Sequence, residues 1–275
     1  MKKLLFAFLA AALVIIFTGC SKINDSNGHL VVKITDAPFP INLIESATVT
    51  ITKVEIRKVG DGISDGNPFM VLWEGSEKFD LLELRNGVVE ELLDVEIPAG
   101  EYNLIRLYVD EAGLKVKDGE SYSVKVPSGK QTGIKLFVEP GLVVEGGLTS
   151  ELLLDFDLSN SFVLQGNIDS PAGIKGFNFK PVIRAVNSSK AGKLEGVVTD
   201  KDNVKIDQAS IVVKQDGADD ISVLSDANGY YAVIGLLSGT YSVVASKENY
   251  ETVTINDVKI VSGNKTVLNF VLQHK

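Results

Sequence analysis

The sequence predicts an all-β protein made of two consecutive β-sandwich domains, and three observations lead to this class. Beyond the first twenty or so residues, no stretch keeps helical i, i+3, i+4, i+7 apolar spacing over the roughly ten residues of an ordinary helix. Short alternating runs bounded by Gly, Asp, Asn or Pro recur instead. Residues 193–275 hold seven such runs in close succession, the spacing typical of a small sandwich.

Composition excludes several classes of function. The 275 residues carry 27 Lys+Arg against 36 Asp+Glu, a formal net charge of −9, which argues against a nucleic-acid partner. A single cysteine leaves no internal disulfide framework. The two histidines, His29 and His274, argue against histidine metal sites and against Ser-His-Asp or Cys-His catalysis. We therefore expect no cofactor and no catalytic residues, and the sequence leaves calcium binding open.

The first domain is expected over residues 29–187. In TVTITKVEIRKV, residues 48–59, the apolar positions change parity, which predicts a β-bulge near Thr52 and Lys53. Pro181 lacks a ladder donor and predicts an edge position or a second bulge. Residues 81–93 are expected to hold a short helical turn. The expected strands are 29–35, 48–59, 69–73, 102–110, 122–126, 134–138, 151–157 and 177–186.

The segment 188–192 has no large apolar side chain and is the expected linker to the second domain, 193–275. A linker of this kind is crossed by few contacts. We therefore expect two independently packed domains.

The first 20 residues, MKKLLFAFLAAALVIIFTGC, resemble a lipoprotein signal peptide. The apolar run Leu4–Phe17 is 14 residues long, shorter than the roughly 20 that span a bilayer as a helix. The resemblance implies removal of residues 1–19, lipidation of Cys20 and a polar tether over 20–28. The expected location is the cell envelope, at the outer membrane of a Gram-negative bacterium. The alternatives are an ordinary secretory signal or an N-terminal membrane anchor.

Two motifs stand out in the second half: SDANGYY, residues 225–231, and LSGTYSV, residues 237–243. Chiefly through them, this half resembles the carboxypeptidase regulatory-like, or transthyretin-like, β-sandwich module. In the first motif Asp226 and Asn228 offer Asx-type bonds, and Gly229 allows a positive φ, so these three residues are assigned to the turn. Such modules are non-catalytic additions to exported proteins, and their fold is grouped with carbohydrate-binding sandwiches.

Four segments characterise the first half: LVVKITDAP at 30–38, IPAGEY at 97–102, LDFD at 154–157 and KPVI at 180–183. Through them, this half resembles a family of envelope lipoproteins defined by a domain of unknown function. The T-D-A-P end of the first segment is the most distinctive part. Because no activity belongs to that family, the resemblance implies location and architecture only.

Three aspartates are candidate ligand or cation contacts. Asp155 and Asp157 lie two residues apart on one strand, which places them about 6.5 to 7 Å apart on the face opposite its apolar residues. This spacing suits a cation or the carboxylate pair of a glycosidase, and equally a solvated strand face. Asp36 is a third candidate, although its place before Ala37 and Pro38 is also explained by a turn.

These observations favour a non-catalytic, lipid-anchored envelope protein that binds a glycan or another envelope protein, with membrane lipid as a partner through Cys20. Two other classes stay open. One is an acidic-residue glycoside hydrolase, and the other is a structural subunit of a surface fibre or receptor complex that uses exposed sheet edges.

Overall fold

The computed structural model describes residues 26–37, 43–60, 68–126, 129, 131–167 and 170–275. Strands make up 67% of the structure and helices 7%, which confirms the all-β prediction. Cys20 lies outside the described residues. The strand expected from residue 29 begins two residues earlier, so residues 27 and 28 of the expected tether belong to it.

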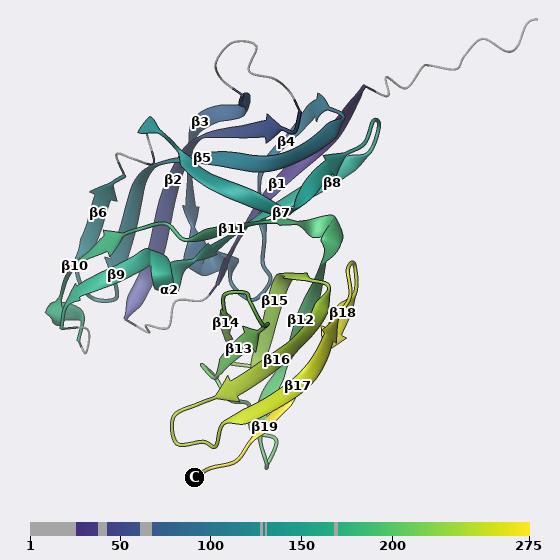
Figure 1. Cartoon of the computed structure of the whole chain (residues 1–275). Coiled ribbons are helices and arrows are strands. Elements are labelled where there is room, and N and C mark those ends of the chain that lie inside the picture. The colour runs from purple at the N-terminus through teal and green to yellow at the C-terminus, as the bar shows by residue number, and fades with distance from the viewer. Residues whose placement is uncertain (1–25, 38–42, 61–67, 127–128, 130, 168–169) are drawn as a thin grey trace, which may run out of the picture.

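The first half of the chain forms a nine-stranded sheet in the order β3-β2-β5-β7-β11-β8-β1-β4, with β6 paired to β5 (Figure 1). A separate two-stranded sheet and short helices complete it. The strands of the large sheet are β1 (Asn27–Ala37), β2 (Ile44–Lys58), β3 (Met70–Asp80), β4 (Glu90–Pro98), β5 (Gly100–Val116), β6 (Ser121–Lys125), β7 (Ile134–Val144), β8 (Thr149–Asp157) and β11 (Ile183–Asn187). The smaller elements are η1 (Leu81–Leu84), α2 (Leu158–Ser161), β9 (Phe162–Gly166), η2 (Pro171–Gly173), β10 (Ile174–Phe179) and η3 (Ser188–Lys190).

The large sheet is folded over one core. Inward positions follow period two, so that Leu30, Val32 and Ile34 of β1 are fully buried and share a cluster with the apolar residues of β2 and β5. Each such side chain contributes roughly 1.5 to 3 kcal/mol when removed from water. The opposite face of β1, β8 and β11 is left for contacts with the second half of the chain.

Two expected irregularities have different outcomes. The bulge is present, because the register of β2 against both β3 and β5 shifts between Ile51 and Lys53. The single strand expected over 177–186 is wrong. Residues 180–182 around Pro181 carry no ladder, so β10 pairs with β9 in the small sheet while β11 enters the large one.

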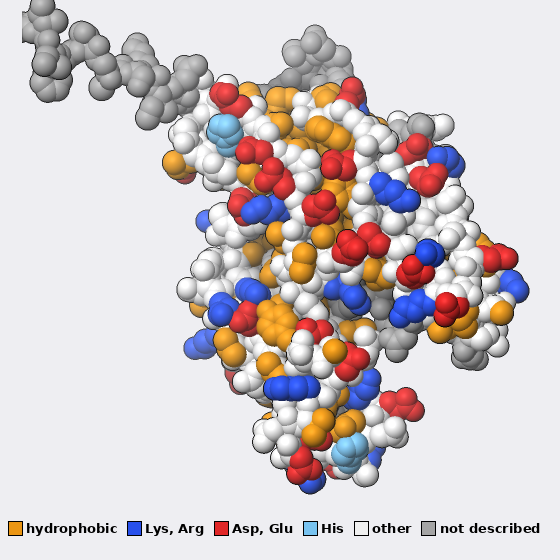
Figure 2. All heavy atoms as spheres, turned by 180° about the vertical axis from the view of Figure 1, so that it is seen from behind, with side chains coloured by type: hydrophobic (Ala, Val, Ile, Leu, Met, Phe, Trp, Pro, Cys, Tyr) orange, Lys and Arg blue, Asp and Glu red, His pale blue; other side chains and the backbone are white. Residues whose placement is uncertain are grey.

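The helical turn expected over 81–93 is confined to η1. The structure then has a strand that the sequence did not predict, β4, which begins at Glu90. The pattern hides it because the adjacent Leu92 and Leu93 break the alternation that marks a strand. As an edge strand β4 exposes Glu90, Glu91, Asp94 and Glu96. Asp and Glu side chains gather on this half in the back view (Figure 2). Charges on an edge oppose pairing with another strand.

The second half is a sandwich of two four-stranded sheets. One has the order β15-β12-β18 with β19 also on β12, and the other has the order β14-β13-β16-β17. The last expected strand is divided in two, because Leu268 and Asn269 interrupt its pairing with β12. The strands are β12 (Ala191–Asp200), β13 (Ser210–Lys214), β14 (Ile221–Leu224), β15 (Tyr230–Leu237), β16 (Gly239–Ser246), β17 (Val253–Ile260), β18 (Lys265–Val267) and β19 (Phe270–Leu272).

The same tyrosine corner occurs in both halves. Tyr102 donates its hydroxyl hydrogen to the Pro98 carbonyl at 2.6 Å, and Tyr241 donates to the Leu237 carbonyl at 2.7 Å. In each case the ring is buried and the acceptor lies four residues upstream. The bond satisfies a buried hydroxyl and holds the corner between two strands.

The turn before β15 has the geometry expected of its sequence. Asp226 Oδ1 accepts hydrogen bonds from the backbone amides of Asn228 and Tyr230, at 2.8 and 2.9 Å. Gly229 has φ 70°, and a Cβ built there would lie 2.4 Å from the Val198 carbonyl oxygen. Both the backbone conformation and the close approach therefore require glycine.

The segment expected to be a linker is an ordered junction. Residues 188–190 form η3, and Ala191 and Gly192 are buried at the start of β12. The Asn187 side chain donates to the Gly141 carbonyl at 3.0 Å and accepts from the Ser189 amide at 3.1 Å. An apolar cluster joins the halves, and it contains Leu153, Val186 and Ala191 with Ile234 and Leu237 packed against them.

Gly229→Ala tests the turn against a matched control. Gly217 also has a positive φ, 79°, but nothing lies within 4 Å of its Cβ position. Gly229→Ala should therefore cost on the order of 1 to 3 kcal/mol more than Gly217→Ala in urea unfolding, because only the former drives a methyl group into a backbone carbonyl. Equal losses would show that the close approach contributes nothing.

Limited proteolysis tests the junction. Although Lys190 is exposed, we expect trypsin to cut after Lys190 more slowly than after Lys201, which lies in an exposed turn between strands. Cutting at Lys190 requires the flanking buried residues to leave both halves first. Mass spectrometry of the early fragments gives the order, and a first cut after Lys190 that releases a folded 191–275 fragment would contradict the ordered junction.

Candidate functional site

One row of side chains crosses the outer face of the large sheet at the junction. Thr35 of β1 is level with Asp155 of β8, and Asp155 is level with Arg184 of β11. The pairing of Ala185 with Val138 continues the row to Phe137 of β7. At one end the row lies beneath the second half, and at the other it enters a cleft.

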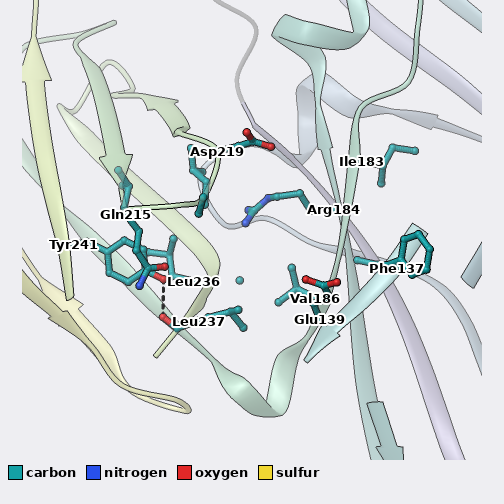
Figure 3. Close-up of a pocket in the computed structure, with 15 residues that line it drawn as sticks. Phe137, Glu139, Ile183, Arg184, Val186, Gln215, Asp219, Leu236, Leu237 and Tyr241 are labelled. Carbon is teal, nitrogen blue, oxygen red and sulfur yellow. Dashed lines mark hydrogen bonds between the residues drawn. The ribbon is translucent and has the colours of Figure 1, made fainter. Parts of the chain in front are cut away.

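The cleft lies between the two halves and has a volume of about 430 Å³ (Figure 3). This is within the usual size of ligand pockets. Arg184 projects into it from β11, while Asp219 and Gln215 lie on the opposite wall. Its lining comes from both halves and comprises Phe137, Glu139, Ile183, Arg184, Ala185, Val186, Val213, Gln215, Ala218, Asp219, Ile221, Gly235, Leu236, Leu237 and Tyr241.

Phe137 supplies an apolar surface to this cleft. Its side chain is 64% exposed, and in the described part of the chain it is the one exposed aromatic residue. Its neighbours Leu136 and Val138 point into the core, so strand alternation itself turns Phe137 outward. Because the exposed ring gains little packing within its own fold, it is available to contact a molecule that enters the cleft.

Two carboxylates of the cleft are not engaged in ion pairs with the described residues. Glu139 and Asp219 have no ion pair with any described residue. The side-chain amide of Gln215 lies over Gly239. A Cβ atom built on Gly239 would be 2.5 Å from Gln215 Nε2. Tyr241, whose hydroxyl is bonded to Leu237, closes one wall. The cleft thus combines one aromatic face with hydrogen-bonding groups of both kinds.

Asp155 is buried under the second half rather than exposed on a solvated face. It is 7% exposed and forms an ion pair with Arg184, whose Nη2 donates to Asp155 Oδ2. Burial raises the pKa of Asp155, and the Arg184 guanidinium acts in the opposite direction. The carboxylate therefore serves to hold Arg184 at the floor of the cleft.

Asp36 is the most isolated polar group of the junction. It is 4% exposed, and neither carboxyl oxygen has a hydrogen-bond partner among the described residues. The backbone amide of Leu158 is the nearby group that acts to lower the pKa of Asp36. Burial, followed by repulsion from Asp155, raises the pKa of Asp36 well above its usual range. Asp36 therefore holds its proton to a higher pH than an exposed aspartate does.

Glu55 shows how a buried acid is compensated elsewhere in this fold. Lys53 approaches it at 2.8 Å, Arg106 at 3.0 Å and the Tyr108 hydroxyl at 2.9 Å. Burial acts to raise the pKa of Glu55, but the hydrogen bonds from Lys53 and Tyr108 lower it overall. Asp36 has no such partners, and this contrast makes it the exception among the buried acids.

The third candidate, Asp157, is a helix cap. Its Oδ1 accepts from the Asn160 amide at 3.0 Å, and its Oδ2 accepts from the Asn160 side chain at 2.7 Å, at the start of α2. The structure therefore brings Asp36 and Asp155 together at the junction and gives Asp157 a local role. In the described ranges no group of three or more His, Cys, Asp or Glu is placed to hold a metal ion.

Asp36 and Asp155 share a cavity of about 10 Å³ with Thr35 and residues of β14 and β15. Such a volume holds about one water molecule. The cleft residues that sequence reasoning did not name as candidates include Phe137, Glu139, Arg184, Gln215 and Asp219. Strand alternation could have indicated Phe137 and Arg184, because it places both side chains on the face of the sheet opposite the core.

Asp36→Asn tests the buried acid. A raised folded pKa means that the folded state binds more protons, so wild-type stability falls as pH rises from about 4, the ordinary aspartate pKa, toward the folded value. The variant should match wild type near pH 3.5 and be more stable at pH 8 in urea unfolding. Asp216→Asn, at an exposed loop carboxyl, should show no such pH-dependent difference. A variant less stable at pH 8 would contradict the assignment.

Comparisons with known proteins identify two domains. A family model described as Domain of unknown function (DUF4382) matches residues 27–181, and the carboxypeptidase regulatory-like domain matches residues 193–273. No curated protein matches the chain. Together the two domains indicate a surface or binding protein without specifying a ligand.

Similar solved structures cover parts or most of the chain at low scores. A 3-chlorocatechol 1,2-dioxygenase from Rhodococcus opacus 1CP is 12% identical over 31% of this chain and 60% of its own, with TM-score 0.25. A DUF3823 family protein from Parabacteroides merdae is 23% identical over 31% of this chain and 47% of its own, with TM-score 0.25. The shaft pilin SpaA from Lactobacillus rhamnosus GG is 9% identical over 91% of this chain and 98% of its own, with TM-score 0.28.

The family match covers more than half of the 275 residues, and the matched range includes the buried Thr35 and Asp36 of β1. The chain therefore belongs to the family defined by the domain of unknown function DUF4382, with a carboxypeptidase regulatory-like domain after it.

Proposed function

We propose that this protein is a lipid-anchored envelope protein that binds carbohydrate in the cleft between its two halves, without catalysing a reaction on it. The observation that carries the proposal is the exposed ring of Phe137 in a cleft whose opposite wall presents Gln215 and Asp219. The two domain types support a binding role and leave the ligand to be found by experiment.

The chemistry of the cleft suits a sugar. The apolar face of a pyranose ring packs on an aromatic ring, while its hydroxyls exchange hydrogen bonds with amides and carboxylates. Phe137 offers the ring on one side of the cleft, and Gln215 and Asp219 offer donors and acceptors on the opposite wall. Arg184, held by Asp155, adds fixed donors at the floor.

A hydrolytic role for the sequence candidates has less support. Hydrolysis by two carboxyl groups needs a sugar ring between or beside them. Asp36 and Asp155 share space for about one water molecule, and Asp155 is bound to Arg184. The carboxyls that do face the cleft are Glu139 and Asp219, so any cleavage would require these two.

Lipid anchoring is proposed from the N-terminal sequence. The lipobox-like Thr18-Gly19-Cys20 precedes β1 by a short polar segment, which would hold the first half close to the membrane surface. No helix among the described residues is long and apolar enough to cross a bilayer. Anchoring at one cysteine leaves the cleft open to ligands outside the membrane.

Phe137→Ala is the direct test of the proposed site. Binding of neutral oligosaccharides, screened on a glycan array and measured by calorimetry, should weaken roughly tenfold, equivalent to about 1.4 kcal/mol. Val143→Ala is the matched control, because Val143 is exposed on the same strand and lies outside the cleft. Chromatography of the recovered oligosaccharide distinguishes binding from cleavage. Unchanged affinity in Phe137→Ala, or shortened sugar, would refute the proposal.

Cys20→Ser tests the anchor. If Cys20 carries the lipid, the variant should lose metabolic label from a fatty-acid analogue and retain its signal segment, which intact mass detects. Wild type expressed in parallel sets the level of labelling. Undiminished label on Cys20→Ser would show that another residue, or none, carries the lipid.

A further inference from the structure

A second hollow adjoins the cleft on the second half of the molecule. It has a volume of about 770 Å³ and shares Gln215 and Tyr241 with the cleft. The two therefore meet along one wall. The rest of its lining comes from β13, β16, β17 and their loops, and comprises Lys214, Asp216, Gly217, Asp220, Thr240, Ser242, Asn256 and Asp257.

Polar, uncharged side chains of two neighbouring strands lie at the centre of this groove. Ser242 of β16 donates its hydroxyl to Asn256 Oδ1 of β17 at 2.8 Å, and Thr240 is exposed beside them. Lys214 is level with Ser242 in the ladder, so the row extends across three strands. Hydroxyls and amides in a row on a sheet face exchange hydrogen bonds with successive polar groups of a chain laid across it.

The charges along the cleft and groove are unevenly paired. Lys214 forms an ion pair with Asp220 at 2.7 Å, and Arg184 is bound to Asp155. The remaining carboxylates have no ion pair with a described residue, and they are Glu139, Asp216, Asp219 and Asp257. The combined surface is therefore negative and repels anionic ligands.

We infer that the cleft and the groove form one continuous site for a linear, uncharged polysaccharide. One end of the chain lies on Phe137 in the cleft, and the following sugars pass Gln215 and run over Ser242 and Asn256. The inference rests on the proposed function and adds the length and charge of the ligand to it.

The surface chemistry favours this ligand over the alternatives. Phe137 is the one exposed large apolar side chain of the two hollows within the described residues. The groove is lined mainly by hydroxyl, amide and charged groups, so a long apolar peptide finds few apolar contacts along it. Acidic or sulfated polysaccharides meet four carboxylates without a compensating cation. A short sugar fills the cleft alone and leaves the polar row of the groove unused.

A length series tests the inference. We expect the affinity of wild type for neutral β-1,4-linked glucose, mannose or N-acetylglucosamine oligomers to rise from two to about six units and then to level off. Phe137→Ala should weaken every length roughly tenfold. Asn256→Ala should weaken only the long oligomers, by about three- to tenfold, while Thr254→Ala, exposed on the same strand outside the groove, should change nothing.

Charge supplies an independent readout. Wild type should not bind alginate or heparin oligomers, and its affinity for neutral oligomers should be insensitive to salt. Asp216→Lys combined with Asp219→Lys should create measurable alginate binding that weakens as salt rises. Tighter binding of alginate than of neutral chains by wild type would overturn the inference.

The outcomes separate the two proposals. If short and long neutral oligomers bind equally and Asn256→Ala is silent, carbohydrate binding in the cleft stands and the continuous site is refuted. If no oligomer of any length binds wild type, both are refuted. Length-dependent binding that is lost stepwise in the two variants supports both.

Discussion

The ion pair between Arg184 and Asp155 is the interaction on which the junction and the cleft depend. A carboxylate taken out of water costs several kcal/mol unless a cation and hydrogen bonds compensate it. Asp155 is covered by the second half, and Arg184, from the neighbouring strand, is its partner. The guanidinium also reaches the cleft. The same ion pair therefore compensates the buried charge at the junction and holds a hydrogen-bond donor in place on the cleft wall.

Close packing joins the two halves at the junction in addition to the ion pair. A Cβ atom built on Gly235 would lie 3.0 Å from the Leu153 side chain, and one built on Gly87 would lie 3.3 Å from the Ile234 side chain. Both glycines therefore allow the two halves to approach closely. Thr35 donates to the Leu84 and Val88 carbonyls and so holds the loop that carries Gly87. A cleft whose two walls are held in this way loses little conformational freedom on binding.

Much of the fold follows from local sequence. Alternation and turn residues predict the all-β class, the parity change in 48–59 predicts the bulge, and the SDANGYY motif predicts a turn with positive φ at Gly229. These features are decided within a few residues of the chain. The division at Pro181 is different, because proline indicates only that pairing is interrupted, and the sheet that each flanking strand joins depends on distant partners.

The sequence by itself determined which side of a strand each residue occupies, and it thereby placed Asp155 opposite the apolar core. Tertiary structure alone decided what covers that side. The second half buries Asp155, leaves Phe137 open to solvent and isolates Asp36 in a space the size of one water molecule. Strand periodicity is a local property of the backbone, whereas burial, ion pairing and cleft formation arise where segments far apart in the chain meet.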